Sequence, residues 1–360
     1  MTGLATAGLA GPLVTPRAAG AATTSTRITV SLPADILRTS VPVNLDTARH
    51  GSAFARSAEA VGVVSELRLG LLRDRLIPGV PDQRRAFERL VALGVRLQAI
   101  SAFAGDDEET VARRVAVAAR WPRLLSSFGY EGTTPSESTR LAGLLTTATR
   151  ARPGLHALPV REHREHSARP DGRNTPTAAV FQPWFAELDQ SQATLVAPRA
   201  WLSQVRAGTT PTAPVVDHGW TLFGESGLVR TGRNAADRWQ RTGAFGALRN
   251  LLRLATDPAP AGPWTTAPSI RIDAPDGVDS LAMRTRDGRL VVALWRPVRP
   301  GSPVTGGAEL PVRLVLDRRA ELASTLPSVS TAVLRRPVGD SWDLTVGDHA
   351  LICTINPERA

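Results

Sequence analysis

The sequence predicts an α/β protein in two parts, a (β/α) barrel followed by an antiparallel β-sandwich. Apolar segments of strand length alternate with helical segments about every 25–30 residues, which is typical of βαβ units and a parallel sheet. The predicted strands end in polar residues, as expected where barrel strands form a functional site at their carboxyl ends. Short strands separated by turns after residue 268 indicate the sandwich.

The elements of the barrel follow one another between residues 27 and 257. The predicted strands are Arg27–Leu32, Val41–Asp46, Val63–Leu72, Arg96–Phe103, Leu124–Phe128, Leu155–Val160, Thr194–Ala197 and Ala213–Trp220. The predicted helices are Ala53–Val61, Gln83–Leu93, Asp106–Arg120, Glu137–Thr149 and Gly243–Leu252. Acidic residues from Asp106 onward favour a helix start because they complement the helix dipole, and Gly94 favours the end of the preceding helix.

A stretch rich in proline and glycine, Pro258–Pro268, separates the barrel from the second part. The strands predicted after it are Ser269–Asp273, Ser280–Arg286, Arg289–Trp295, Val312–Leu316, Thr331–Arg335 and Ala350–Ile355. Asp287-Gly288 is a hairpin turn of the Asp-Gly type. We therefore expect a tail at residues 1–26, a barrel-like domain at 27–257 and a sandwich domain at 268–360.

The first 22 residues are mostly small and apolar and end in an alanine-rich segment. They resemble the apolar region and cleavage site of a secretory signal, although the basic residues that normally precede them are missing. A disordered tail is the alternative interpretation. We predict a secreted or cell-envelope protein, and no run approaches the roughly 18 apolar residues of a membrane span.

The chain of 360 residues has a net charge of +10 and 43 basic residues, all of them arginine. The absence of lysine excludes Schiff-base catalysis. The arginines are scattered, whereas nucleic-acid binding requires a basic stripe, so we predict no nucleic-acid partner. Cys353 is the only cysteine, which excludes an internal disulfide and a cysteine-based zinc site. We predict no cofactor, and the oligomeric state stays open.

The strand at Leu124–Phe128 leads into an acidic loop, YEGTTP at residues 130–135, before a helical segment. The loop resembles the EGPNE turn after the fourth barrel strand of the large clan of retaining glycoside hydrolases. In that clan the last Glu of the turn is the general acid/base. Glu131 and Gly132 match the turn, but Pro135 stands where the acid should be. Since proline cannot donate a proton, the resemblance implies a degenerate TIM-like barrel.

Further segments carry the resemblance from Val41 to the C-terminus. Arg73-Asp74 is similar to the second-strand segment, and Pro214-Val215-Val216 is similar to the seventh strand, whose Glu is the nucleophile in the clan. Here Asp217-His218 follows instead of a Glu. Gly227–Arg230 resembles the segment that closes such barrels, and Thr221–Glu225 is interpreted as a remnant of the eighth strand.

A retaining glycosidase needs two carboxylates about 5–5.5 Å apart. Glu131 and Asp217 are the pair at the expected strand ends, and Glu137 and Glu225 are displaced substitutes. The alternative interpretation makes Glu131 a structural carboxylate and Asp217 a loop residue. The candidate substrate-binding residues are Arg73, Tyr130, His218 and Trp220, with Trp220 as a platform on which a sugar ring would stack.

The segment Glu162–His166 invites a metal interpretation, but its two histidines are three residues apart. Zinc protease helices need a spacing of four, so we predict a solvated loop and no metal site.

These patterns predict a secreted protein that resembles glycoside hydrolases, has impaired or lost catalysis, and binds carbohydrate or cell-wall polysaccharide. One alternative is an active retaining hydrolase that uses displaced carboxylates. A second alternative is an envelope-associated structural or interaction protein, because a basic surface suits anionic cell-wall polymers.

Overall fold

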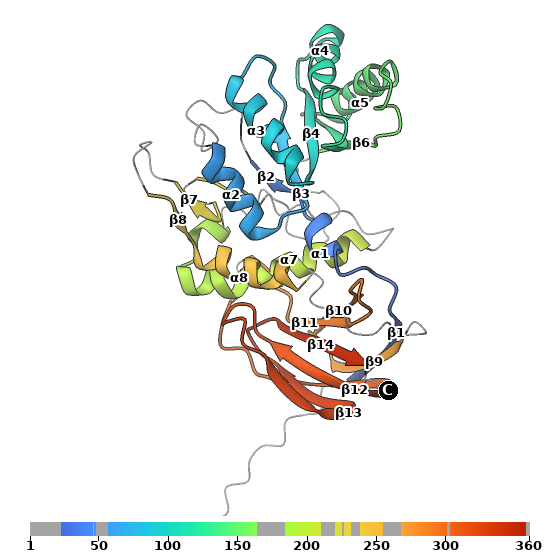
Figure 1. Ribbon diagram of the computed structural model, residues 1–360, viewed down its shortest axis with the longest axis vertical. Helices are drawn as coiled ribbons and strands as arrows, with labels where there is room; N and C mark the ends of the chain where they lie inside the picture. The colour runs from blue at the N-terminus through green and yellow to red at the C-terminus, as the bar shows by residue number, and fades with distance from the viewer. Residues whose placement is uncertain are drawn as a thin grey trace, which may run out of the picture.

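The computed structural model describes residues 23–45, 47, 57–163, 184–209, 220–224, 227–231, 238–254, 268–300 and 303–357. Figure 1 shows three layers in this part of the chain: a parallel sheet with its own helices at one end, a central layer of helices, and an antiparallel sheet at the other end. The predicted mixed α/β fold is confirmed at this level.

The parallel sheet has five strands among the described residues, and their order in the sheet is their order in the sequence. The strands are β2 (Val43–Asn44), β3 (Leu71–Arg75), β4 (Arg96–Phe103), β5 (Leu125–Glu131) and β6 (Val160–Glu162). The helices between them are α2 (Ser57–Leu67), α3 (Pro81–Ala92), α4 (Glu108–Ala118) and α5 (Pro135–Arg150). This is the expected series of βαβ units.

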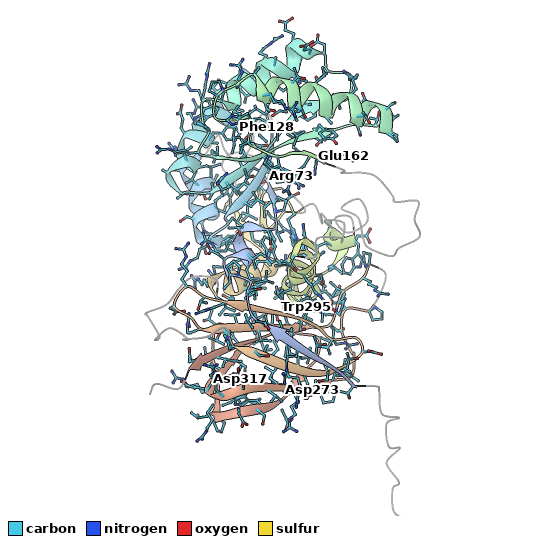
Figure 2. The ribbon with its side chains drawn as sticks, turned by 90° about the vertical axis from the view of Figure 1, so that its right-hand side faces the viewer. Arg73, Phe128, Glu162, Asp273, Trp295 and Asp317 are labelled. Atoms are coloured by element: carbon cyan, nitrogen blue, oxygen red, sulfur yellow. The ribbon has the colours of Figure 1, made fainter. Side chains whose placement is uncertain are left out.

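The two faces of the parallel sheet differ in chemistry. Successive side chains of a strand point to opposite faces, and residues paired in a parallel register share a face. The face covered by helices carries the register partners Asp74, Ala99, Phe128 and Val160. The opposite face, called the inner face below, carries Arg73, Gln98 and Ser127 and, two residues further on, Arg75, Ile100, Gly129 and Arg161. Figure 2 shows Phe128 and Arg73 on opposite sides of the sheet.

The sheet continues past β2 at one edge. The Asn44 amide donates to the Trp220 carbonyl at 2.7 Å, and the Leu222 amide donates to the Asn44 carbonyl at 3.0 Å, with a parallel bridge between Asn44 and Thr221. This pairing agrees with a remnant strand at this place. Among the described residues no strand pairs with the outer edge of β6, so a closed barrel is not seen in this part of the chain.

The predicted strand Thr194–Ala197 is wrong because it is helical, and the predicted strand Val63–Leu72 is helical in its first half and confirmed only at Leu71–Leu72, which begin β3. Val63–Leu67 belongs to α2, and Thr194–Ala197 lies within α7 (Gln190–Thr209). In α2 the buried residues recur three and four positions apart, at Ala60, Val63, Val64 and Leu67. That spacing defines one face of a helix, and burial of this face outweighs the strand preference of the valines.

The central layer consists of α1 (Ile36–Thr39), α7 and α8 (Gly243–Arg253). The Trp201 indole of α7 donates to the Leu37 carbonyl at 2.8 Å, which fixes α1 on α7. α8 approaches α7 so closely at Gly243 that a Cβ there would overlap Thr194. Glycine is therefore needed at the first position of α8.

The C-terminal sheet is antiparallel, with the order β1-β9-β12-β14-β11-β10 and β13 paired to β12. Its strands are β1 (Thr23–Thr29), β9 (Ser269–Pro275), β10 (Asp279–Arg284), β11 (Leu290–Trp295), β12 (Leu310–Thr325), β13 (Leu334–Val346) and β14 (Leu351–Pro357). The long strand β12 pairs with β9 through Arg313–Leu316 and with β14 through Ala320–Thr325. One continuous sheet therefore curls around its own core, and the predicted sandwich of two separate sheets is not confirmed among the described residues.

β11 is buried on both faces and joins two cores. Leu290, Val292 and Leu294 pack inside the curled sheet, whereas Val291, Ala293 and Trp295 pack into the core shared with the helices. The Trp295 indole donates to Ser203 Oγ of α7 at 2.9 Å, and Figure 2 shows Trp295 where the sheet meets the helical layer. The antiparallel sheet thus has a core of its own on one face of β11 and shares a second hydrophobic core with the helical layer on the other face.

The first described strand does not belong to the parallel sheet. β1 pairs with β9 in a register that sets Arg27 opposite Arg271. Residues 27–29, which sequence analysis assigned to the barrel, therefore lie in the C-terminal sheet. The predicted linker falls at residues 258–267, outside the described residues, and that boundary stays a prediction. No helix in the described ranges has the length and apolar character needed to cross a membrane.

Candidate functional site

Three side chains meet at the carboxyl ends of the inner-face strands. Glu131 is the last residue of β5, the fourth strand of the parallel sheet. Its Oε2 lies 3.1 Å from Nη2 of Arg75, and its Oε1 accepts from Nε of Arg75 at 3.4 Å. His163 Nε2 lies 3.7 Å from the same Oε1. The end of β3, the end of β5 and the residue after β6 thus form one polar cluster.

The three side chains of the cluster differ in their exposure to solvent. The His163 side chain is 2% exposed and that of Glu131 is 19% exposed, whereas Arg75 retains 48%. The His163 amide donates to the Tyr130 carbonyl at 2.8 Å, which continues the sheet pairing and sets the direction of the imidazole. Only the arginine end of the cluster is therefore broadly open to solvent.

Arg73 lies one step below this cluster on the inner face. Its side chain is buried, and its Nε donates to Gln98 Oε1 at 2.8 Å across the β3–β4 register. The predicted ligand contact of Arg73 would require a ligand to reach this interior position.

The other two carboxylates near the strand ends make hydrogen bonds that hold helices against the sheet. Asp74 points to the helix face, where it accepts from the Arg75 amide at 2.9 Å and from Gln83 at 3.5 Å, and it contacts buried Thr47. Glu162 accepts from Ser138 Oγ of α5 at 2.7 Å. Both groups therefore fasten helices to the sheet.

Glu137, the displaced substitute for the acid, is also held by backbone. Its oxygens accept from the Thr133 amide at 2.9 Å and the Gly105 amide at 3.0 Å. The hydrogen bond from the Thr133 side chain, followed by these backbone bonds, lowers the pKa of Glu137. A general acid needs a raised pKa, so this environment opposes that role.

Only some of the other predicted site residues belong to the part of the chain that the structure describes. Tyr130 is next to Glu131 and half-buried. Asp217, His218 and Glu225 lie outside the described residues, so the catalytic pair stays a prediction.

Trp220 is a core residue rather than an open platform. It is 3% exposed, and its ring centroid lies 5.6 Å from that of Trp201 and 5.3 Å from that of Phe185. Its indole donates to Gln204 Oε1 at 3.1 Å. An enclosed ring has no free face on which a sugar could stack.

Sequence reasoning missed Arg75, Arg161 and His163 as inner-face residues. His163 was assigned to a solvated loop, but it is buried beside Glu131. The available signal was the alternation in Arg73–Arg75 and Arg161–His163, which places the first and last residue of each triplet on one face. Within the described ranges no group of three or more histidine, cysteine, aspartate or glutamate side chains is arranged to hold a metal ion.

No family model and no curated protein matches the chain. Similar solved structures include an α-amylase from Lactobacillus plantarum, with a TM-score of 0.41, 9% identity, and coverage of 89% of this chain and 99% of the other. A β-xylosidase from Caulobacter crescentus has a TM-score of 0.39, 10% identity, and coverage of 89% and 97%. Likenesses at this level do not assign the chain to a family.

Proposed function

We propose that this chain is an exported carbohydrate-binding protein, built on a degenerate (β/α) barrel related to retaining glycoside hydrolases, with impaired or lost hydrolysis. The observation that carries the proposal is the state of Glu131. It ends the fourth parallel strand, where the resemblance expects the acidic turn, yet both of its oxygens contact Arg75. A carboxylate engaged in this way positions a guanidinium rather than transferring a proton.

The surrounding chemistry supports binding without cleavage. Pro135 begins α5 and carries no acid, and Glu137 and Glu162 are held by framework hydrogen bonds. Losing a general acid costs roughly 10²–10⁴-fold in rate. The polar inner-face strand ends still offer donors and acceptors that suit sugar hydroxyls.

The test combines binding and turnover on the same preparation. A glycan array should detect binding, while chromogenic glycosides should be hydrolysed at background rates. Glu131→Gln and Asp217→Asn should leave any residual rate unchanged within a factor of about two. Turnover near the usual 1–10³ per second, abolished by either substitution, would establish the active hydrolase instead.

Export is tested separately, because it does not depend on the site. Mass spectrometry of the protein from its native host should find a mature N-terminus between about residues 19 and 26, as the small-residue cleavage rule requires. An intact Met1 in the cytosolic fraction would contradict export and favour the tail interpretation.

A further inference from the structure

The inner face carries more positive than negative charge near the strand ends. Among the described residues of β3 to β6, it holds four arginines: Arg73, Arg75 and Arg161 towards the carboxyl ends, and Arg96 at the amino end of β4. It holds a single carboxylate, Glu131. The other two carboxylates of these strands, Asp74 and Glu162, belong to the helix face. Even with the Glu131–Arg75 pair counted as neutral, the exposed guanidinium of Arg161 adds a positive charge near the strand ends.

Arg161 and Arg75 are the exposed arginines near the carboxyl ends, whereas Arg73 is buried. Its neighbours in β6 point to the helices, because Val160 packs on the core and Glu162 accepts from Ser138 of α5. Alternation therefore directs Arg161 to the inner face, opposite Gly129 of β5, which contributes no side chain. The Arg161 side chain is exposed and makes no hydrogen bond or ion pair with any described residue.

The chemistry of these arginines specifies a kind of ligand. A guanidinium has a planar set of donors that matches carboxylates and phosphates in pairs, and such charge-assisted bonds are about twice as strong as neutral ones. Neutral sugars lack a group of that charge and shape. Arg161 and the half-exposed Arg75 lie on the same inner-face row, so one polymer can reach both.

We propose that the inner face binds an anionic group of a carbohydrate polymer, with Arg161 as the main contact and Arg75 as the second. The group is a sugar carboxylate or a phosphate ester. This inference rests on the proposed carbohydrate binding and specifies its ligand class.

The experiment measures affinity by isothermal titration calorimetry for polygalacturonate, a phosphorylated mannan and neutral dextran. The variants are Arg161→Gln, Arg161→Lys and the matched control Arg123→Gln. Arg123 is likewise exposed, makes no hydrogen bond or ion pair with described residues, and precedes β5 at the opposite end of the sheet. Both glutamine variants remove one exposed positive charge in or next to the parallel sheet, which controls for the overall charge of +10.

We expect tighter binding to one anionic polymer than to dextran, and the preferred polymer identifies carboxylate or phosphate as the ligand group. Arg161→Gln should weaken that binding about tenfold or more, as the loss of one charge-assisted contact predicts. Arg161→Lys should fall between, because it keeps the charge but not the planar donors. Arg123→Gln should change the affinity less than about twofold.

Equal weakening by Arg161→Gln and Arg123→Gln would overturn the inference in favour of unspecific charge attraction. Equal binding of dextran that Arg161→Gln leaves unchanged would also overturn it, while the proposed carbohydrate binding would stand. Absence of binding to all three polymers and to a glycan array would contradict both. Circular dichroism of each variant confirms that the fold is retained.

Discussion

Cys353 is enclosed in β14, within the core of the curled sheet, and is fully buried. Burial raises the pKa of its thiol to about 12, because the thiolate would lose its hydration. The thiolate is the reactive form, so a native thiol here should not react. We expect no labelling by a disulfide reagent at pH 8 in native buffer and complete labelling in guanidinium chloride.

The control for this labelling is Cys353→Ala, which should show no signal in either condition. Native labelling at the rate of an exposed thiol would mean that β14 opens readily, in conflict with a closed core.

The candidate site was only partly predictable at the level of residues. Glu131 was located correctly at a strand end because the sequence of the loop at residues 130–135 indicates where the strand ends. Trp220 was misjudged, because composition cannot tell an aromatic ring at a strand end from one packed against Trp201. Arg161 and His163 were hidden by uncertainty about where β6 begins, since a shift of one residue moves every side chain to the other face.

At the scale of single elements, α8 depends on its first turn. Thr242 accepts from the Phe245 amide at 3.2 Å, and its hydroxyl donates to the Leu228 carbonyl at 2.8 Å. We expect Thr242→Ala to lower the free energy of unfolding by about 1–2 kcal/mol, in the range for threonine caps. Urea denaturation followed by tryptophan fluorescence measures this.

Thr242→Ser is the matched control, because it keeps the capping oxygen and should restore most of the loss. If serine destabilises as much as alanine, the methyl packing of Thr242 matters more than the cap.

A second element-level contact ties α2 to α8 and to β8 (Gln240–Arg241). Glu66 accepts from Arg241 at 2.9 Å and from Arg249 at 2.9 Å. Partial burial raises the pKa of Glu66, but the two arginine hydrogen bonds outweigh it and the net pKa is lowered. A lowered pKa in the folded state gives stability above the unfolded pKa of 4.5, and this stability is lost as pH falls through the folded pKa.

We therefore expect the stability difference between the native protein and Glu66→Gln to be full at pH 7 and to shrink below about pH 4.5. Thermal melts between pH 3 and 7 test this. A difference that does not vary with pH would show that Glu66 acts through packing rather than charge.

Prediction of the elements succeeded where one pattern dominated. The strand Arg96–Phe103 is confirmed as β4, because six of its residues are apolar or small and flanking turns mark its ends. It failed at Val63–Leu72, where a helix and a strand share one apolar run that Gly70 interrupts. The sequence also predicts only Val312–Leu316 of β12. The arginine and acidic residues in the middle of this strand hide the alternate burial of its side chains.

At the scale of the whole molecule, Arg199 joins the helical layer to the antiparallel sheet. It is buried in α7 and donates to three carbonyls, those of Arg296 at 2.8 Å, Val304 at 3.2 Å and Asp348 at 3.1 Å. Burial lowers the pKa of Arg199 to about 10, so it stays charged at neutral pH. The three carbonyls compensate the charge for its lost hydration.

We expect Arg199→Met to lower the free energy of unfolding by about 2–4 kcal/mol, because three enclosed carbonyls lose their donor. Chemical denaturation should show the whole protein shifting to lower denaturant, since the two layers share a core. Arg199→Lys should recover part of the loss. A separate early transition for one layer alone would contradict a shared core.

The pairing of β1 with β9 joins a strand that is synthesised early to one that is synthesised late. Ser25 donates to Asp273 at a separation of 248 residues. At about 5–20 residues per second, β1 leaves the ribosome roughly 12–50 seconds before its partner exists. Its seven residues are mostly polar and exposed, so the waiting strand has little tendency to find a wrong apolar contact. Completion of the C-terminal sheet is thus a late event that needs nearly the entire polypeptide, and a truncated translation product would lack it.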